Sequence, residues 1–165
     1  MIQMLKFLTL FIFCMIAISC SVHKKVSLKE KNIMNVYAIR LKPGEDLKQS
    51  LDNFVKEKNI EAGWITTCVG SVTDYNIRFA NQPNGSTGTG HFEIVSLVGT
   101  VSVNGSHIHL SISDSTGKTI GGHLMAGCKI YTTAEIVIQE SKEIIFAREV
   151  DGTTPWPELQ IKTKQ

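Results

Sequence analysis

The chain has little net charge of either sign. It contains 17 lysine and arginine residues against 15 aspartate and glutamate residues, for a formal charge of +2 at pH 7. Removal of residues 1–19 would delete one basic residue, Lys6, and leave +1. No lysine- and arginine-rich cluster of the kind that contacts a phosphate backbone is present. This composition argues against a protein that binds polyanions through bulk charge.

Cysteine is scarce, with four in 165 residues. Cys14 and Cys20 fall in the N-terminal segment, and Cys68 and Cys128 each lie inside an apolar, strand-like run. We expect these last two to be buried free thiols, although an exported location would also permit a disulfide.

Residues 1–19 are typical of a lipoprotein-type signal peptide. Lys6 is their only charged residue, and residues 7–19 are almost wholly apolar but too short and too close to the terminus for a typical membrane span. An ordinary cleaved signal and an uncleaved anchor are the alternatives.

Cys20 is the expected site of lipidation. Small residues precede it, as in bacterial lipoproteins, although Ala17 stands where leucine is usual. Residues 20–33 are polar and would form a tether. We therefore expect a lipid-anchored protein of the bacterial cell envelope, attached to a membrane through its N-terminal lipid.

The rest of the chain suits one domain at residues 34–150, followed by a C-terminal tail at residues 151–165. The only helical pattern lies at residues 45–58, with an apolar stripe of Leu47, Leu51, Phe54 and Val55. Glu45 and Asp46 would occupy its first turn. Trp156 is expected to pack and anchor the tail.

The remaining segments have the alternation and residue types of strands. We expect strands at residues 34–41, 64–73, 75–80, 92–103, 107–113, 119–125, 129–139 and 143–149, with a loop at 81–90. One main helix against a mostly antiparallel β-sheet predicts an α+β fold.

Three histidines are the most informative residues of this sheet. His107 and His109 share one expected strand, and His123 lies in the next. His107 and His109 point to the same face because side chains alternate along a strand. Whether His123 joins them depends on the turn between the strands.

The turn residues favour a register that places His123 on the same face as His107 and His109. Asp114 and Gly117 suit a type I turn with a bulge, which prefers a polar first residue and a glycine in the left-handed position. If Asp114 pairs with Lys118, His109 lies directly opposite His123. A loop of two or four residues would instead turn His123 to the other face.

Three converging neutral imidazoles can bind a divalent metal ion, and zinc is the expected metal. The alternative is a hydrogen-bonded histidine pair with no metal. His23 lies in a polar segment and is expected to be solvated. His91 could either join a site or face solvent.

Several motifs follow one another in a specific order. They are YAIRLKPGE at 37–45, GS at 70–71, IR at 77–78, GHFEI at 90–94, SLVG at 96–99, HIH at 107–109, D-x-x-G at 114–117, GGHL at 121–124 and AE at 134–135. This ordered set resembles the plant- and prokaryote-conserved (PPC) domain, which occurs alone in bacteria and archaea and beside AT-hooks in plant nuclear proteins. The resemblance covers roughly residues 34–148.

The resemblance implies a homotrimer and strengthens the expectation of a metal at His107, His109 and His123. The sheet pattern agrees with assembly. Two expected strands carry apolar residues at both odd and even positions, and therefore on both faces, and one helix cannot cover both faces. These residues are Ile94 and Leu97 in one strand and Ile130 and Val137 in the other.

Nucleic-acid binding rests on family analogy alone. The plant members bind AT-rich DNA through an Arg-Gly-Arg-Pro core, and this sequence contains no such core. Export would also separate the chain from the nucleoid.

Arg40 and Arg78 lie in apolar, strand-like surroundings, where an arginine usually needs a carboxylate partner. Glu93 and Glu135 are the candidate partners, in structural ion pairs at a subunit interface; a clamp for a substrate anion is the second interpretation. Three glycines, Gly70, Gly121 and Gly122, are expected to permit bulges or a close approach of the backbone.

The function predicted is that of an exported, metal-binding homotrimer that serves as a binding or assembly module. The alternative is a zinc-dependent enzyme in which the three histidines leave a fourth position open and Glu93 or His91 acts as general base. No recognisable nucleophile arrangement favours an enzyme. DNA binding is the third and weakest hypothesis.

Overall fold

The computed structural model describes residues 33–164. Its elements, in chain order, are β1 (Met34–Leu41), α2 (Leu47–Glu57), β2 (Gly63–Arg78), β3 (Ser86–Val101), β4 (His107–Ser113), β5 (Thr119–Leu124), β6 (Lys129–Ser141), β7 (Ile144–Glu149) and β8 (Glu158–Thr163). The expected signal peptide, the lipidation site Cys20 and the tether lie outside the described residues.

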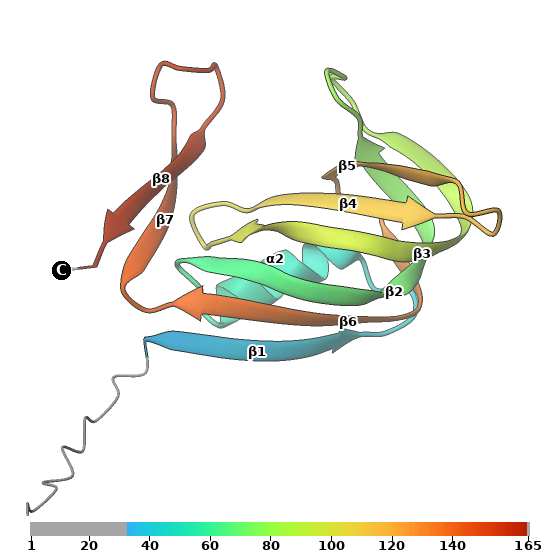
Figure 1. Cartoon of the computed structure of the whole chain (residues 1–165), viewed down its shortest axis with the longest axis horizontal. Helices are drawn as coiled ribbons and strands as arrows, with labels where there is room; N and C mark the ends of the chain where they lie inside the picture. The colour runs from blue at the N-terminus through green and yellow to red at the C-terminus, as the bar shows by residue number, and fades with distance from the viewer. Residues whose placement is uncertain (1–32, 165) are drawn as a thin grey trace, which may run out of the picture. The chain divides into compact units, whose positions relative to one another are not determined.

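Six strands form one antiparallel sheet in the order β1-β6-β2-β3-β4-β5 (Figure 1). The far end of β2 also pairs with β5, which draws the sheet round on itself there. β7 and β8 form a separate two-stranded sheet. The predicted combination of a mostly antiparallel sheet with one main helix is confirmed.

The core lies between α2 and one face of the large sheet, and Figure 1 shows the helix behind the strands. Leu47, Leu51 and Val55 are buried, as their spacing along the helix predicts. Buried aliphatic side chains of the strands complete this core, among them Ile77, Ile108, Leu110, Ile112, Leu124, Ile136 and Ile138. The opposite face of the sheet is therefore the one available for a site.

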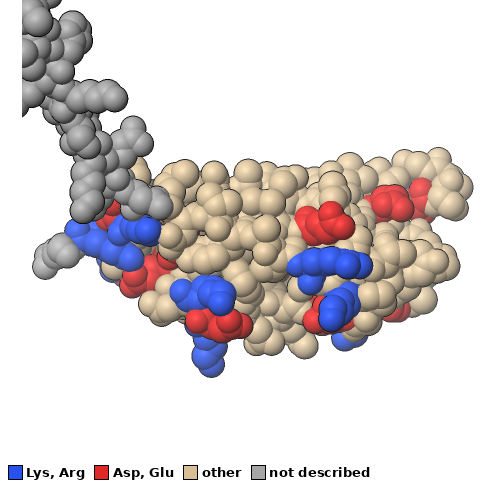
Figure 2. Space-filling model, turned by 90° about the horizontal axis from the view of Figure 1, so that it is seen from below, with Lys and Arg blue, Asp and Glu red and all other residues tan. Residues whose placement is uncertain are grey.

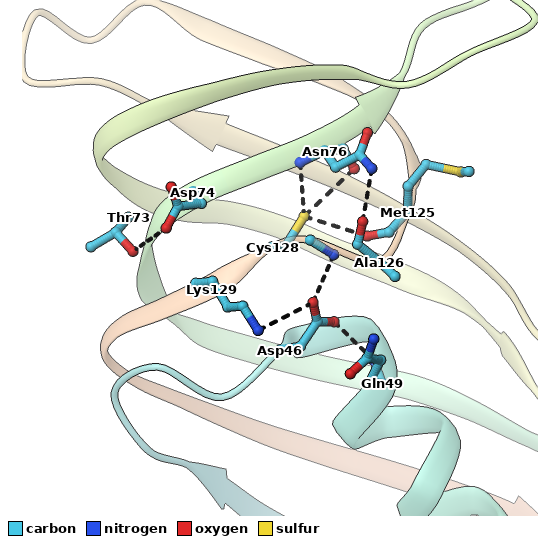
Figure 3. A network of polar contacts seen from close by, with 10 residues as sticks. Asp46, Gln49, Thr73, Asp74, Asn76, Met125, Ala126, Cys128 and Lys129 are labelled. Carbon is cyan, nitrogen blue, oxygen red and sulfur yellow. Dashed lines mark hydrogen bonds and ion pairs between the residues drawn. The ribbon is translucent and has the colours of Figure 1, made fainter.

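The helix begins two residues later than predicted, because Asp46 is its N-cap instead of a first-turn residue. Its Oδ1 accepts a hydrogen bond from the backbone N–H of Gln49 at 3.0 Å, and its Oδ2 accepts one from the backbone N–H of Gly127 at 2.6 Å (Figure 3). A single carboxylate thus caps the helix and ties it to the segment before β6.

Both described cysteines are free thiols. Cys128 is fully buried, and its Sγ accepts a hydrogen bond from the backbone N–H of Asn76 at 3.3 Å (Figure 3). Burial raises the pKa of Cys128 to about 11 and that of Cys68 to about 12. The expectation of free thiols is confirmed, with Cys68 half-buried rather than fully buried.

Three expectations about the strands, the loop at 81–90 and Trp156 were wrong. The two strands expected at residues 64–73 and 75–80 are one strand, β2, which continues through an irregularity between Val72 and Asp74. The expected loop at 81–90 is shorter, because β3 already begins at Ser86, and the C-terminal segment at 151–165 contains β8, which pairs with β7. Trp156 does not pack and is 69% exposed.

A bulge in β3 removes one argument that both faces of the sheet carry apolar residues that need burial. Ile94 and Leu97 are both buried, because the pairing with β4 shifts by one residue between Ile94 and Ser96. Their opposite parity in the sequence therefore does not place them on opposite faces. In β6, by contrast, Ile130 is buried and Val137 is half-buried on the other side.

The described residues include no helix that is both long enough and apolar enough to span a membrane. On the face seen in Figure 2, acidic and basic side chains are interspersed rather than collected by sign. This agrees with the balanced charge of the sequence.

Candidate metal centre

The turn between β4 and β5 has the predicted form. The backbone N–H of Asp114 donates to the carbonyl of Lys118 at 3.0 Å, and the N–H of Gly117 donates to the carbonyl of Asp114 at the same distance. Gly117 has φ of +84°, the left-handed conformation that glycine adopts without strain. The side chain of Asp114 also accepts hydrogen bonds from the N–H groups of Thr116 and Lys118.

This turn sets the register that brings the histidines together. His109 is directly opposite His123, as predicted. The buried side chains of Ile108 and Leu110 point to the core, so His107 and His109 point away from it. All three imidazoles therefore lie on the side of the sheet that the helix does not cover.

The three rings form a compact cluster. Their centroids are 5.0 Å apart for His107 and His109, 5.1 Å for His107 and His123, and 5.9 Å for His109 and His123. One ring nitrogen from each residue lies within 4.8 Å of the other two, and the Nε2 atoms of His107 and His109 are 3.2 Å apart. This three-histidine cluster could hold a metal ion.

The donor set and its spacing fit a zinc ion. Two nitrogens that are each about 2.1 Å from one zinc lie at most about 4.2 Å apart. Small rotations of the side chains would close the difference from 4.8 Å. In addition, Nδ1 of His123 is buried without a hydrogen-bond partner. A buried ring nitrogen left unpaired is costly, and coordination is one way to satisfy an imidazole.

The surroundings favour the neutral, metal-binding form of the imidazoles. Burial, together with the charges of His107 and Arg78, lowers the pKa of His123 to about 4. Burial also lowers the pKa of His107, with smaller contributions from His109, Arg148 and Arg78. Neutral imidazole is the form that binds a metal, so less competition from protons is expected at these two ligands.

The two residues considered as general bases, Glu93 and His91, lie elsewhere. Glu93 is opposite Ser113, four residues along β4 from His109, which corresponds to roughly 13 Å along a strand. The ring of His91 packs against Tyr131 of β6, with centroids 4.2 Å apart. The structure does not bring either side chain to the cluster.

The arginines have different environments. Arg40 is opposite Glu135, but its Nε donates to the hydroxyl of Thr133 at 3.1 Å. Arg78 is directly opposite His123. Within residues 33–164 neither arginine makes an ion pair with a carboxylate, and a partner across a subunit interface stays a prediction.

Sequence reasoning missed Arg148, which lies in β7. Its Nη2 donates to the hydroxyl of Thr100 at 2.7 Å, and Thr100 is directly opposite His107. No local signal could have revealed this neighbour, because the contact joins residues 48 positions apart.

Two predicted close approaches of glycine are confirmed. A Cβ added at Gly70 would lie 2.2 Å from the carbonyl oxygen of Thr133, and one at Gly122 would lie 2.5 Å from that of Arg78. The absence of a side chain at Gly122 thus allows β5 to meet β2 beside the three-histidine cluster.

Fold and cluster together define a class, an α+β domain with three histidines gathered on the uncovered face of a β-hairpin. The family model of the Plants and Prokaryotes Conserved (PCC) domain matches residues 28–142, and the chain belongs to this family. The family suggested by the order of the motifs is therefore confirmed.

The chain is similar to part of two larger curated proteins. Both are named Bifunctional protein GlmU, from Synechococcus sp. strains JA-3-3Ab and JA-2-3B'a(2-13), and they are 42% and 40% identical to it over 129 residues. These matches cover 78% of this chain but 21% and 20% of the relatives. The chain thus spans about a fifth of their length.

Three solved structures share the fold over most of their length. A hypothetical protein from Salmonella cholerae-suis is 39% identical with a TM-score of 0.79, covering 80% of this chain and 96% of that one. A metal-containing protein from Archaeoglobus fulgidus is 25% identical with a TM-score of 0.66, covering 76% and 93%. A PPC protein from Pyrococcus horikoshii is 29% identical with a TM-score of 0.61, also covering 76% and 93%.

Proposed function

We propose that this chain is a metal-binding PPC-domain module in which His107, His109 and His123 hold one zinc ion. The observation that carries the proposal is the spacing of the three ring nitrogens, all within 4.8 Å of one another. The description of the related Archaeoglobus fulgidus protein as metal-containing supports it. When bound, the ion would supply a positive centre able to polarise or hold a ligand at this face.

The metal proposal is tested by metal analysis of the purified full chain. The wild-type protein should contain about one zinc ion per chain, and His109→Ala should lose most of it because two imidazoles bind a divalent ion far more weakly than three. His91→Ala is the matched control, since His91 packs against Tyr131 and should not affect zinc content. A wild-type chain that takes up no metal, or an unaltered zinc content in His109→Ala, would contradict the assignment.

We also propose that the module works as a homotrimer. The side of the sheet not covered by α2 carries exposed valines, among them Val36, Val69 and Val98, with exposed fractions of 63%, 59% and 54%. Apolar groups of this kind favour burial in an assembly, and a closed three-fold ring gives every subunit the same contact. Light scattering on the purified chain should give about three times the chain mass; a folded monomer at micromolar concentration would contradict the trimer.

Attachment to a membrane of the bacterial cell envelope through Cys20 is the third part of the proposal. It rests on the sequence of residues 1–20 alone. Cys20→Ser should abolish lipid attachment, which mass spectrometry of the N-terminal peptide would detect as loss of the acyl mass. Recovery of unmodified, full-length wild-type chain from the cytoplasm would contradict export.

A zinc-dependent enzyme is the second candidate, and the exposure of His107 and His109 favours it. An ion held by three imidazoles on an open face keeps a position for water or substrate. Two surface hollows of about 570 and 420 Å³ are lined by residues other than these histidines. Neither provides a substrate pocket at the cluster, so we rank the binding module above the enzyme.

A further inference from the structure

We propose that the three-histidine cluster is one half of a binding site for an oxyanion, a carboxylate or phosphate group of a small molecule. In this site Arg78 and Arg148 hold the anion from two sides while it completes the coordination of the metal. The inference rests on the proposed metal centre and names the class of ligand that the centre takes.

Arg78 is held beside the cluster by the pairing of β2 with β5. It is directly opposite His123, and the preceding pair, Ile77 and Leu124, is buried in the core. Since side chains alternate along a strand, Arg78 and His123 point to the same, uncovered face. Side chains directly opposite each other have Cβ atoms about 5 Å apart, well within reach of a guanidinium group.

Arg148 approaches from another part of the chain. The hydroxyl of Thr100 that accepts from its Nη2 belongs to the residue opposite His107. Its aliphatic stem packs over the turn between β3 and β4, where a Cβ added at Gly105 would lie 3.1 Å from its Cγ. Arg148 therefore reaches the side of the cluster opposite to Arg78.

The strand that carries Arg148 is firmly attached to this turn. The carbonyl of Phe146 accepts hydrogen bonds from the hydroxyl of Ser102 at 3.1 Å and from the side-chain amide of Asn104 at 3.0 Å. The N–H of Phe146 donates to the carbonyl of Glu61 at 2.9 Å. The position of Arg148 is thus built into the fold instead of being a chance conformation of a surface side chain.

Neither arginine has the partner that half-buried arginines usually have. Across the described part of the chain, every ion pair involves a lysine, and none involves Arg78 or Arg148. The charge of Glu158 acts on His107, but its Oε1 already accepts a hydrogen bond from Thr154 at 2.8 Å. A half-buried guanidinium without a carboxylate partner is unfavourable unless an anion joins it.

The charges of the loaded site call for an anionic ligand. Three neutral imidazoles leave a divalent ion with its full charge. The two arginines add two more positive charges, and Glu158 contributes one negative charge. The fork of N–H donors on a guanidinium matches the paired oxygens of a carboxylate or phosphate. An oxyanion at the open coordination position would offset this excess of positive charge.

The experiment uses the full chain loaded with cobalt or zinc and freed of excess ion. Acetate and inorganic phosphate are titrated separately, followed by calorimetry and by the visible absorption of the cobalt form. At least one of the two should bind and change the cobalt spectrum; acetate alone would identify carboxylates, and phosphate alone phosphate groups. No heat and no spectral change with either anion would overturn the proposal.

Variants of the arginines provide the decisive comparison. Arg78→Gln and Arg148→Gln should each weaken binding of the anion about tenfold, the loss expected for one charge-assisted hydrogen bond. Arg40→Gln is the matched control, because Arg40 lies on the same sheet but donates to Thr133, and it should bind as the wild type does. Equal affinity in all three variants would overturn the proposal.

A second readout does not depend on the anion. In anion-free buffer, Arg78→Gln should bind zinc about threefold more tightly, because a like charge close to the ion is removed. Arg148→Lys keeps the charge, so it should leave the zinc affinity unchanged while still lowering the affinity for the anion. A lower zinc affinity in Arg78→Gln would mean that the arginine merely supports the fold, and would overturn the proposal.

The two proposals fail in different ways. A wild-type chain that takes up no metal contradicts the metal centre itself. A chain that takes up zinc but ignores both anions contradicts only the oxyanion site.

Discussion

Asp114 and Lys118 close the turn that positions the three-histidine cluster, through a 3.0 Å hydrogen bond from the N–H of Asp114 to the carbonyl of Lys118. They are the last pair before the ladder in which His109 opposes His123. The number of residues between Asp114 and Lys118 therefore decides which face His123 occupies.

Deletion of Ser115 from this turn should abolish metal binding. A loop shorter by one residue shifts the register by one and turns His123 towards the other face, whereas His107 and His109 keep theirs. Zinc content per chain is the measurement, with circular dichroism to confirm that the variant is folded. Gly44→Ala is a control for a strained turn in another part of the fold, between β1 and α2, since Gly44 also has a positive φ, of +84°, and this variant should keep its zinc. A folded deletion variant with full zinc content would contradict the role of the turn.

The stability of the metal-free chain should fall between pH 7 and pH 4, in part because of His123. Burial and nearby positive charges lower its pKa to about 4, whereas an unfolded histidine has a pKa near 6.5. The stabilisation is therefore fully present above pH 6.5 and is lost as the unfolded chain, but not the folded one, takes up a proton.

His123→Gln should flatten that pH dependence by on the order of 1–2 kcal/mol, a value reduced for the partial exposure of the ring. Urea unfolding at pH 7 and pH 4.5, in the presence of a chelator, measures the free energy of unfolding of both proteins. The same difference between the two pH values in wild type and variant would show that His123 does not titrate as described.

Asp46→Ala should lower the free energy of unfolding by about 2–4 kcal/mol. The carboxylate caps α2 and also accepts a hydrogen bond from Gly127, so its loss leaves two donors without a partner. Asp52→Ala is the control, because Asp52 pairs with Lys48 on the exposed side of the same helix and such pairs contribute only about 0.3–0.5 kcal/mol. Equal losses in both variants would argue against the capping role.

Cys68 and Cys128 should resist alkylation in the folded protein at pH 7.5. Their raised pKa values, about 12 and about 11, leave almost no thiolate, which is the reactive form. Site-resolved mass spectrometry after iodoacetamide treatment should find both unmodified until urea is added. Rapid labelling of Cys128 in the native state would show that its burial is transient.

The elements that local sequence determines were predictable. β1 and β4 have the predicted bounds, and the register of β4 with β5 followed from the turn chemistry of Asp114 and Gly117. The apolar stripe of α2 also predicted its buried face, because the period of a helix is fixed by geometry.

Features that arise from contacts between distant segments were not predictable. The bulge that buries both Ile94 and Leu97 depends on how β3 meets β4, not on the residues of β3 alone. Arg148 lies beside the three-histidine cluster only because β7 is attached to the turn between β3 and β4. A single sequence carries the pattern of each strand but not the position of one strand against another.

The three histidines lie within 17 residues of the chain, on two strands joined by one short turn. Three other pairings, β1–β6, β2–β6 and β2–β5, join distant segments, and the partners in β1 and β6 are about 100 residues apart. Local hairpins form in microseconds, while distant strands must first overcome the entropy of closing a long loop. We therefore expect the ligands to be assembled before the sheet is complete, so that an available ion could bind during folding and guide the strands that follow.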